Sequence, residues 1–165
     1  MKALGKTEIR VGIADAKIVS APNRIVTIGL GSCVGVALYD TVSKITALIH
    51  VMLPDSSAFK VISNPYKFAD LAIPIIVEKM IEQGCVKKNI VAKIAGGASM
   101  FKFSEKVIHS DVGVRNIEAV KVAIKKEGLP IIAEDIGGNK GRTMFVESED
   151  GSVLIRIVGE GIKKI

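Results

Sequence analysis

The residue best suited to covalent chemistry in this sequence is a cysteine framed by small residues. Cys33 ends the run T-I-G-L-G-S-C over residues 27–33 and is followed by valine and glycine. A thiolate is a strong nucleophile, but a free thiol with a pKa of about 8.5 needs a base or a positive neighbour to form it. Gly29 and Gly31 are expected to leave the backbone open to a substrate, and N–H groups beside Cys33 could hold an oxyanion. The competing interpretation is a buried, inert thiol.

His50 is the natural partner for such a thiol. It stands in the apolar run I-T-A-L-I-H-V-M-L over residues 45–53, where a buried imidazole without a partner would be costly. A turn-rich segment, residues 40–44, separates this run from the one after Cys33, so the two runs are expected to be neighbours. A Cys33–His50 pair is therefore feasible. The competing interpretation is a hydrogen-bonded core histidine with no chemical role.

Other kinds of site fit the sequence less well. The glycine-rich run lacks a dinucleotide-binding fingerprint, because Val34 stands where the third glycine is needed. Two histidines and two cysteines without ligand spacing make a poor metal set, and we expect no metal and no cofactor. Cys85 follows a glycine that ends a predicted helix, and His109 lies in a polar stretch, so both are expected to be structural or incidental.

Composition limits the partners and the compartment. The 165 residues suit a single domain over residues 1–165, with an aliphatic core because only 4% are aromatic. The net charge is +6, the charged residues are spread along the chain, and the densest basic runs are only lysine pairs. Aromatic residues for base stacking are also scarce, so the composition disfavours a nucleic-acid partner. Apolar runs of about 18 residues and a signal-peptide core are absent, so we expect no membrane insertion and a cytoplasmic protein.

The elements that must position Cys33 and His50 are mostly strands. Capping signals and helical periodicity predict two helices, over residues 64–83, starting at Asn64 and Pro65, and over 114–127. Many strands in mixed order with few helices favour an α+β fold, or a sandwich of sheets with helices outside, over a parallel doubly wound sheet. The predicted strands are residues 9–13, 24–30, 34–39, 45–53, 90–95, 129–136, 144–148 and 152–158.

Around Cys33 and His50, and at three later elements, the sequence resembles the CheD family, the chemoreceptor glutamine deamidases of bacterial and archaeal chemotaxis. Five elements in the family's order carry the resemblance, which spans roughly residues 8–158. They are T-x-G-L-G-S-C at 27–33, H-x-M-L-P at 50–54, A-K-I-A-G-G-A-x-M-F at 92–101, I-G-x-R-N at 112–116, with valine for the isoleucine, and E-D-x-G-G-N-x-x-R at 134–142. Their number and order make the resemblance specific.

The resemblance implies a role for each candidate residue. Cys33 resembles the nucleophile, His50 its general base, and Thr27 the third member that orients the imidazole. The implied reaction is hydrolysis of selected glutamines on methyl-accepting chemotaxis proteins, with release of ammonia, by a thiolate paired with an imidazolium. The implied fold resembles that of cytotoxic-necrotizing-factor deamidases: mixed sheets in a sandwich with helices outside. The backbone that supports the oxyanion is expected at Ser32, Gly31 and Gly29.

The resemblance leaves other functions open. Family members often bind the CheY-phosphate phosphatase CheC, so the alternative is a non-catalytic interaction protein that binds receptors or stimulates CheC. A thiol hydrolase acting on receptor methyl esters is weaker, although esters and amides share the acyl-transfer route. Residues 55–66 match no single family pattern, and only seven residues follow Val158, so partner contacts are not implied for either segment.

Overall fold

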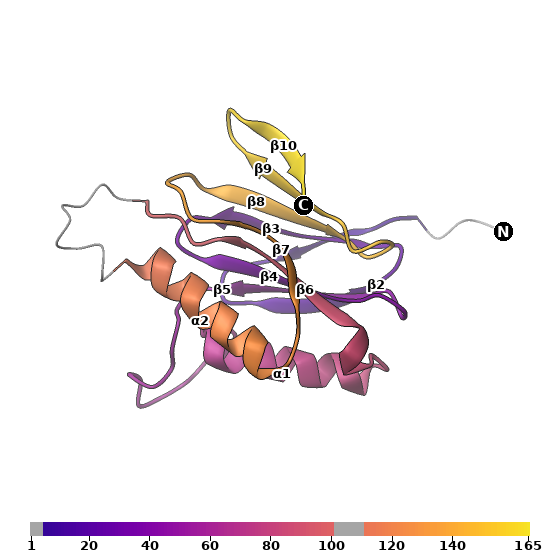
Figure 1. Ribbon diagram of the computed structural model, residues 1–165, viewed down its shortest axis with the longest axis horizontal. Helices are drawn as coiled ribbons and strands as arrows, with labels where there is room; N and C mark the ends of the chain where they lie inside the picture. Colours follow the sequence, from indigo (N-terminus) through magenta and orange to yellow (C-terminus); the bar gives the residue numbers. More distant parts are fainter. Residues whose placement is uncertain (1–4, 101–110) are drawn as a thin grey trace.

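The computed structural model describes residues 5–100 and 111–165 and arranges them in three layers, an outer sheet, a central sheet and a pair of helices (Figure 1). The outer sheet has the strand order β1-β3-β8-β9-β10, and the central sheet has the order β2-β5-β4-β6-β7. Both sheets are mixed, because β1 pairs with β3 and β6 with β7 in parallel. The elements are β1 (Glu8–Val11), β2 (Ala16–Ser20), β3 (Arg24–Leu30), β4 (Val34–Asp40), β5 (Ile45–Val51), η1 (Pro65–Lys67), α1 (Ala69–Glu82), η2 (Lys87–Asn89), β6 (Ile90–Gly96), α2 (Val112–Lys126), β7 (Ile131–Ile136), β8 (Arg142–Glu147), β9 (Val153–Ile157) and β10 (Gly161–Lys164).

Strand β4 explains how the layers divide. All of its residues are buried, which is typical of a strand that is covered on both faces. Val36 and Leu38 pack with the helices, whereas Ala37 packs toward the outer sheet, because side chains alternate along a strand. One core therefore lies between the central sheet and the helices, and a second core lies between the two sheets. The predicted α+β sandwich with helices on the outside is confirmed.

Helix α2 confirms the second predicted helix. Val120 and Ile124 are buried and Ile117 packs against the same core, so the predicted apolar face is the one that covers the sheet. The helix starts at Val112, two residues earlier than predicted. The earlier start follows from Asp111, whose side chain accepts a hydrogen bond from the Gly113 N–H at 2.8 Å and caps the first turn.

The first predicted helix is divided, which corrects the prediction of one helix over residues 64–83. Asn64 caps a short 3-10 turn that begins at Pro65, as the capping signal predicts, but α1 starts only at Ala69. Phe68 between them is extended, with φ −112° and ψ 133°. The interruption has a tertiary cause, because the backbone around Phe68 pairs with Leu53, just beyond the end of β5.

The strand predictions hold best where apolar residues are continuous. The predicted strand 9–13 ends at Val11, and Ile13 is 61% exposed, because the chain turns at Ala14 with φ 55°. The run 45–53 ends as a strand at Val51, and 129–136 begins at Ile131. Strands β2 and β10 were not expected, and β10 is exposed throughout, without an apolar pattern to mark it. The likeness to cytotoxic-necrotizing-factor deamidases stays a prediction.

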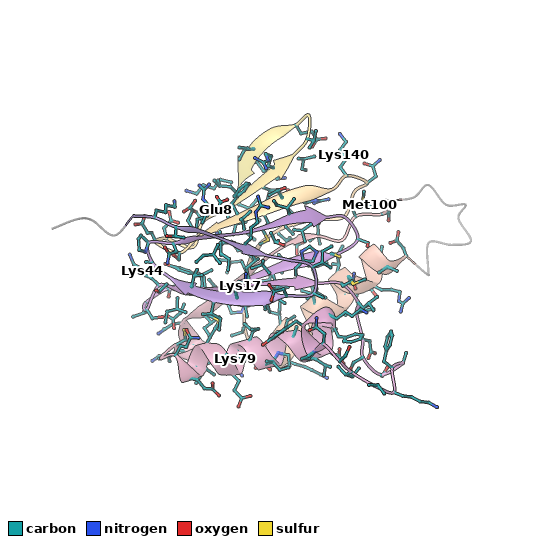
Figure 2. All side chains as sticks on the ribbon, turned by 180° about the vertical axis from the view of Figure 1, so that it is seen from behind. Glu8, Lys17, Lys44, Lys79, Met100 and Lys140 are labelled. Carbon is teal, nitrogen blue, oxygen red and sulfur yellow. The ribbon has the colours of Figure 1, made fainter. Side chains whose placement is uncertain are left out.

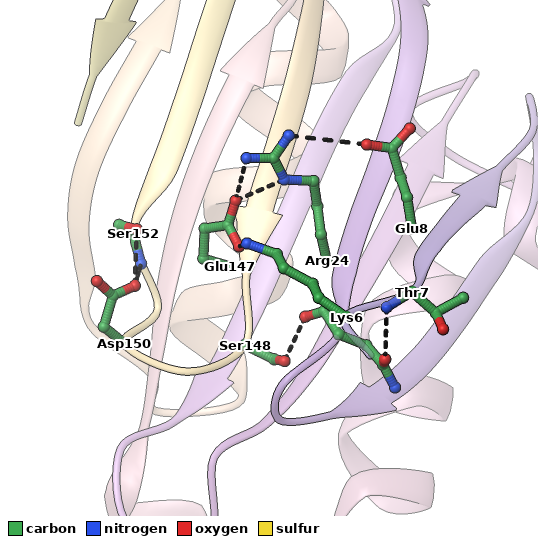
Figure 3. A network of polar contacts seen from close by, with 9 residues as sticks. Lys6, Thr7, Glu8, Arg24, Glu147, Ser148, Asp150 and Ser152 are labelled. Carbon is green, nitrogen blue, oxygen red and sulfur yellow. Dashed lines mark hydrogen bonds and ion pairs between the residues drawn. The ribbon is translucent and has the colours of Figure 1, made fainter. Parts of the chain in front are cut away.

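A polar network ties the strands of the outer sheet at one end (Figure 3). Arg24, the first residue of β3, donates from Nε and Nη2 to Glu147 Oε1, each at 2.5 Å, and its Nη1 lies 3.7 Å from Glu8. Lys6 also pairs with Glu147. Arg24 is the register partner of both Glu8 and Glu147, so the ion pairs hold β1, β3 and β8 in one alignment. The opposite end of β3 leads into the segment that carries Cys33.

Candidate active site

Cys33 lies in the short loop, residues 31–33, that joins β3 of the outer sheet to β4 of the central sheet. The residue is partly exposed and packs against the core between the sheets. Cys85, by contrast, is buried in the core between the central sheet and the helices. The two cysteines therefore lie on different sides of the central sheet, and only Cys33 combines some exposure with a place between the sheets.

The backbone of this loop is held by the segment that follows β6. Gly97 N–H donates to the Cys33 carbonyl at 2.8 Å, and Ala98 N–H donates to the Gly31 carbonyl at 2.8 Å. Gly96, at the end of β6, has φ 108°, and a Cβ there would overlap the Cys33 carbonyl oxygen. Only glycine fits at this position, and its absence of a side chain allows β6 to approach the loop closely.

His50 is the next-to-last residue of β5, and its register partner on β4 is Gly35. The pairing places the histidine beside the start of β4, opposite a residue that follows Cys33 by two positions in the sequence. Its imidazole is fully buried between the sheets, and Nε2 has no hydrogen-bond partner among the described residues. The structure therefore places His50 on β5, the neighbour of β4, which is the strand that follows Cys33, as the sequence predicts.

Thr27 of β3 reaches His50 across the space between the sheets. Its Oγ1 lies 2.7 Å from Nδ1 of His50 and 2.8 Å from the carbonyl oxygen of Val11. A carbonyl oxygen can only accept, so the hydroxyl hydrogen goes to Val11 and Nδ1–H must donate to the hydroxyl oxygen. A neutral imidazole carries a single N–H, and Nε2 is therefore left with its lone pair free. This tautomer is the one that a general base requires.

Burial favours the neutral forms of both groups. Desolvation lowers the pKa of His50 from 6.5 to about 4. Burial also raises the pKa of the Cys33 thiol, and a hydrogen bond from its own backbone N–H offsets this only in part. At neutral pH these directions favour a protonated thiol at Cys33 and a neutral imidazole at His50. These directions describe each group by itself, and the thiolate–imidazolium pair that the resemblance implies stays a prediction.

The buried imidazole makes stability depend on pH in a defined window. The unfolded chain protonates His50 near pH 6.5 and the folded chain only near pH 4, so stability falls as the pH drops through that range. The shift corresponds to about 3 kcal/mol. We expect urea unfolding to show this loss between pH 7 and pH 4 in the wild type but not in His50→Gln. An equal loss in both proteins would contradict a depressed pKa at His50, because all other groups titrate alike in the two chains.

The two glycines before Cys33 differ in how far their backbone is covered. Gly29 has φ 79° where the pairing of β3 with β8 is irregular, and nothing lies within 4 Å of a Cβ built on it, so its backbone is open, as expected. Gly31 is covered, because a Cβ built on it would lie 3.2 Å from Cγ of Met100, and its N–H donates to the Gly29 carbonyl at 3.0 Å. Figure 2 shows Met100 and Lys140 at the same end of the sheets. Gly31 is therefore not the open backbone position that the sequence suggested.

Sequence reasoning assigned no role to two buried polar groups near this loop. Asn116 of α2 is fully buried and donates to backbone carbonyls of two other segments. Arg142, the register partner of Leu30, is buried and pairs with Asp135 at the end of β7. The sequence pattern does mark Asn116, because it interrupts the apolar face of a predicted helix. A polar side chain in such a place is expected to have specific hydrogen-bond partners.

Neither a metal cluster nor a membrane span is found in the part of the chain that the structure describes. Over residues 5–100 and 111–165, no group of three or more His, Cys, Asp or Glu side chains is placed to hold a metal ion. Across the same residues, no helix has the length and apolar content needed to cross a membrane. His109 lies outside the described residues.

Comparison with known proteins places the chain among close relatives. It is 59% identical over 159 residues to a protein of Clostridium botulinum (strain Eklund 17B / Type B), which covers 96% of this chain and 98% of that protein. It is 57% identical over 162 residues to one of Clostridium novyi (strain NT), covering 98% and 100%, and 53% identical over all 165 residues to one of Clostridium tetani (strain Massachusetts / E88). Each relative bears the name "Probable chemoreceptor glutamine deamidase CheD".

Solved structures are more distant. The hypothetical protein YfiH of Bacillus licheniformis is 17% identical and superposes with a TM-score of 0.47, over 73% of this chain and 49% of that chain. A likeness at this level carries no argument about this chain. The family model described as CheD chemotactic sensory transduction matches residues 52–157, which lie after Cys33 and His50, whereas the Clostridium relatives cover those residues as well. With most of its length matched by that model and by relatives above 50% identity, the chain belongs to the CheD family.

Proposed function

We propose that this protein hydrolyses the side-chain amide of selected glutamines on chemoreceptors, leaving glutamate and releasing ammonia, and that residues 1–165 act as one domain in this reaction. Relatives at 53–59% identity are named for this activity. The observation that carries the chemical part is the hydrogen-bond chain from Val11 through Thr27 to His50, which leaves Nε2 unprotonated in a buried site. A deamidase with a thiol nucleophile needs such a base.

The reaction is proposed to begin from the neutral pair. As Sγ of Cys33 attacks the amide carbon, its proton passes to Nε2 of His50, and the carbonyl π electrons move onto oxygen. The N–H groups of Ser32 and Cys33, which donate to no backbone carbonyl among the described residues, are the candidate donors to this oxyanion, the Cys33 N–H turning from its own sulfur to the substrate oxygen. The N–H of Gly31 is already bonded to Gly29 and is not needed in this role.

The second half of the cycle restores the enzyme. The His50 imidazolium gives its proton to the leaving nitrogen, the C–N bond breaks, and ammonia departs from a thioester at Cys33. Water then loses a proton to Nε2 and attacks the thioester carbon. The tetrahedral intermediate collapses, the C–S bond breaks, the sulfur regains a proton from His50, and a glutamate side chain is released. Each proton transfer uses the same nitrogen, which Thr27 holds in one orientation.

The proposed function is tested with wild-type protein and the cytoplasmic fragment of a chemoreceptor from the same organism. We expect ammonia release, together with the small mass gain that accompanies replacement of an amide nitrogen by oxygen, at specific glutamines. Methanol release from a methylated receptor would instead favour the esterase alternative. If a folded enzyme and a folded receptor fragment released neither ammonia nor methanol, the proposed activity would be rejected. CheC binding, which stays a prediction, would then be the function to test.

Thr27 offers a matched pair of variants. Thr27→Val keeps the shape but removes the oxygen that accepts from Nδ1 of His50, so the imidazole loses its orientation and its preferred tautomer. We expect the turnover number for deamidation to fall by about 10²-fold, whereas Thr27→Ser, which keeps the hydroxyl, should stay within a few-fold of wild type. Steady-state kinetics on the receptor fragment measures both. Equal losses in the two variants would contradict a role for the hydroxyl.

A further inference from the structure

Hydrogen bonds hold three successive carbonyl groups of the loop that carries Cys33. The two outer carbonyls accept from backbone groups, and the middle one accepts from a side chain. The carbonyls of Gly31 and Cys33 accept from backbone N–H groups of the segment after β6. The carbonyl of Ser32, between them, accepts from the side chain of Asn116, with Nδ2 at 2.9 Å. The orientation of this middle peptide group therefore depends on one amide from α2, a helix whose Asn116 is 84 residues away in sequence.

The same amide reaches the strand that carries His50. Nδ2 of Asn116 also lies 3.0 Å from the carbonyl oxygen of Met52, which is two residues beyond His50 and just past the end of β5. An amide nitrogen has two hydrogens, so both bonds can form at once. Asn116 thus joins the loop of the candidate nucleophile to the end of the strand of the candidate base.

The direction of the amide is fixed by its partners. Both partners are carbonyl oxygens, which only accept, so Nδ2 must face them and Oδ1 must face away. Asn116 is fully buried, and its Oδ1 has no hydrogen-bond partner among the described residues. A buried acceptor without a donor is unfavourable. The two donated bonds, and not the oxygen, are therefore what the side chain contributes.

The start of α2 is fitted closely to the segment that holds the loop. A Cβ on Gly113 would lie 2.5 Å from the carbonyl oxygen of Ala98 and 2.7 Å from that of Gly97. A Cβ on Gly97 would in turn overlap the side chain of Ile117. Glycine at both positions lets the helix approach the segment after β6 closely. Asn116 lies almost one helical turn after Gly113. The amide is therefore held on a helix whose first turn packs directly against this segment.

The carbonyl of Ser32 and the N–H of Cys33 belong to one planar peptide group. A hydrogen bond that fixes the carbonyl also fixes the direction of the N–H on the other side of the plane, and that N–H is a candidate oxyanion donor. We propose that Asn116 is a positioning residue, which orients the Ser32–Cys33 peptide so that the Cys33 N–H stabilises the oxyanion. This inference rests on the proposed deamidation.

The test separates the oxyanion from the nucleophile. Deamidation needs the oxyanion donor, whereas alkylation of Cys33 by iodoacetamide is a displacement without an oxyanion. For Asn116→Leu, which removes both donors at similar volume, and for Asn116→Ala, we expect the turnover number to fall by about 10²-fold. The KM for the receptor fragment and the alkylation rate of the Cys33 peptide, followed by mass spectrometry, should stay within a few-fold of wild type.

A matched control lies one turn further along the same helix face. Val120→Ala should lower the melting temperature through lost packing and leave the turnover number of the folded protein unchanged. The inference is overturned if folded Asn116→Leu or Asn116→Ala deamidates at the wild-type rate, or if alkylation of Cys33 slows by the same factor as deamidation. Failure of the proposed function itself would look different, because the wild-type protein would then release no ammonia.

Discussion

Replacing Cys33 with alanine should abolish ammonia release from the receptor fragment, with a loss of at least about 10⁴-fold in the turnover number. The variant lacks the sulfur that forms the thioester in the proposed mechanism. The fold should persist, because Cys33 is partly exposed and the loop is held through its backbone. Ammonia release and receptor mass spectrometry measure the outcome, with a thermal melt to confirm folding.

Cys85 provides the matched control for this experiment. It is the other cysteine of the chain, but it lies in the core between the central sheet and the helices. Cys85→Ala should therefore lose some stability and keep its activity. Deamidation by folded Cys33→Ala at anything near the wild-type rate would remove Cys33 from the mechanism. The same variant also tests the non-catalytic alternative: if it still binds receptor or stimulates CheC, an interaction role exists beside catalysis.

Replacing His50 with glutamine should reduce the turnover number by about 10²- to 10⁴-fold. Glutamine is polar and can still donate to Thr27, but it offers no nitrogen lone pair that could take the thiol proton. The thiol pKa is raised by burial, so Cys33 needs this base more than an exposed cysteine would. Steady-state kinetics on the receptor fragment gives the turnover number, and thermal melts confirm that the variant is folded.

Thr46 is the control for His50. It lies four residues earlier on β5, is also fully buried, and its hydroxyl has no partner among the described residues. Thr46→Val alters a buried polar side chain of the same strand and keeps the shape, so activity should stay near the wild-type level. A folded His50→Gln protein that is as active as Thr46→Val would show that another group, or water, takes the proton from Cys33.

Local patterns in the sequence predicted most of the fold. Continuous apolar runs marked the buried strands β3, β4, β5 and β6, and the apolar face of α2 was read from its spacing. Patterns failed where distant backbone decides the conformation. Phe68 is extended because it pairs with the segment after β5, and β10 forms at an exposed edge by pairing with β9 although its side chains carry no burial signal.

For the site, the sequence by itself indicated the candidate reactive groups, Cys33 and His50, and the small residues around Cys33. A cysteine among small residues and a lone histidine in an apolar strand are recognisable without coordinates, and so are the family's motifs. The tertiary structure decided the protonation and orientation of these groups. Thr27 acts on His50 from another sheet, and Asn116 acts on the Ser32 peptide from a helix 84 residues further on. Such contacts depend on directions in space, and a linear pattern of residue types does not contain those directions.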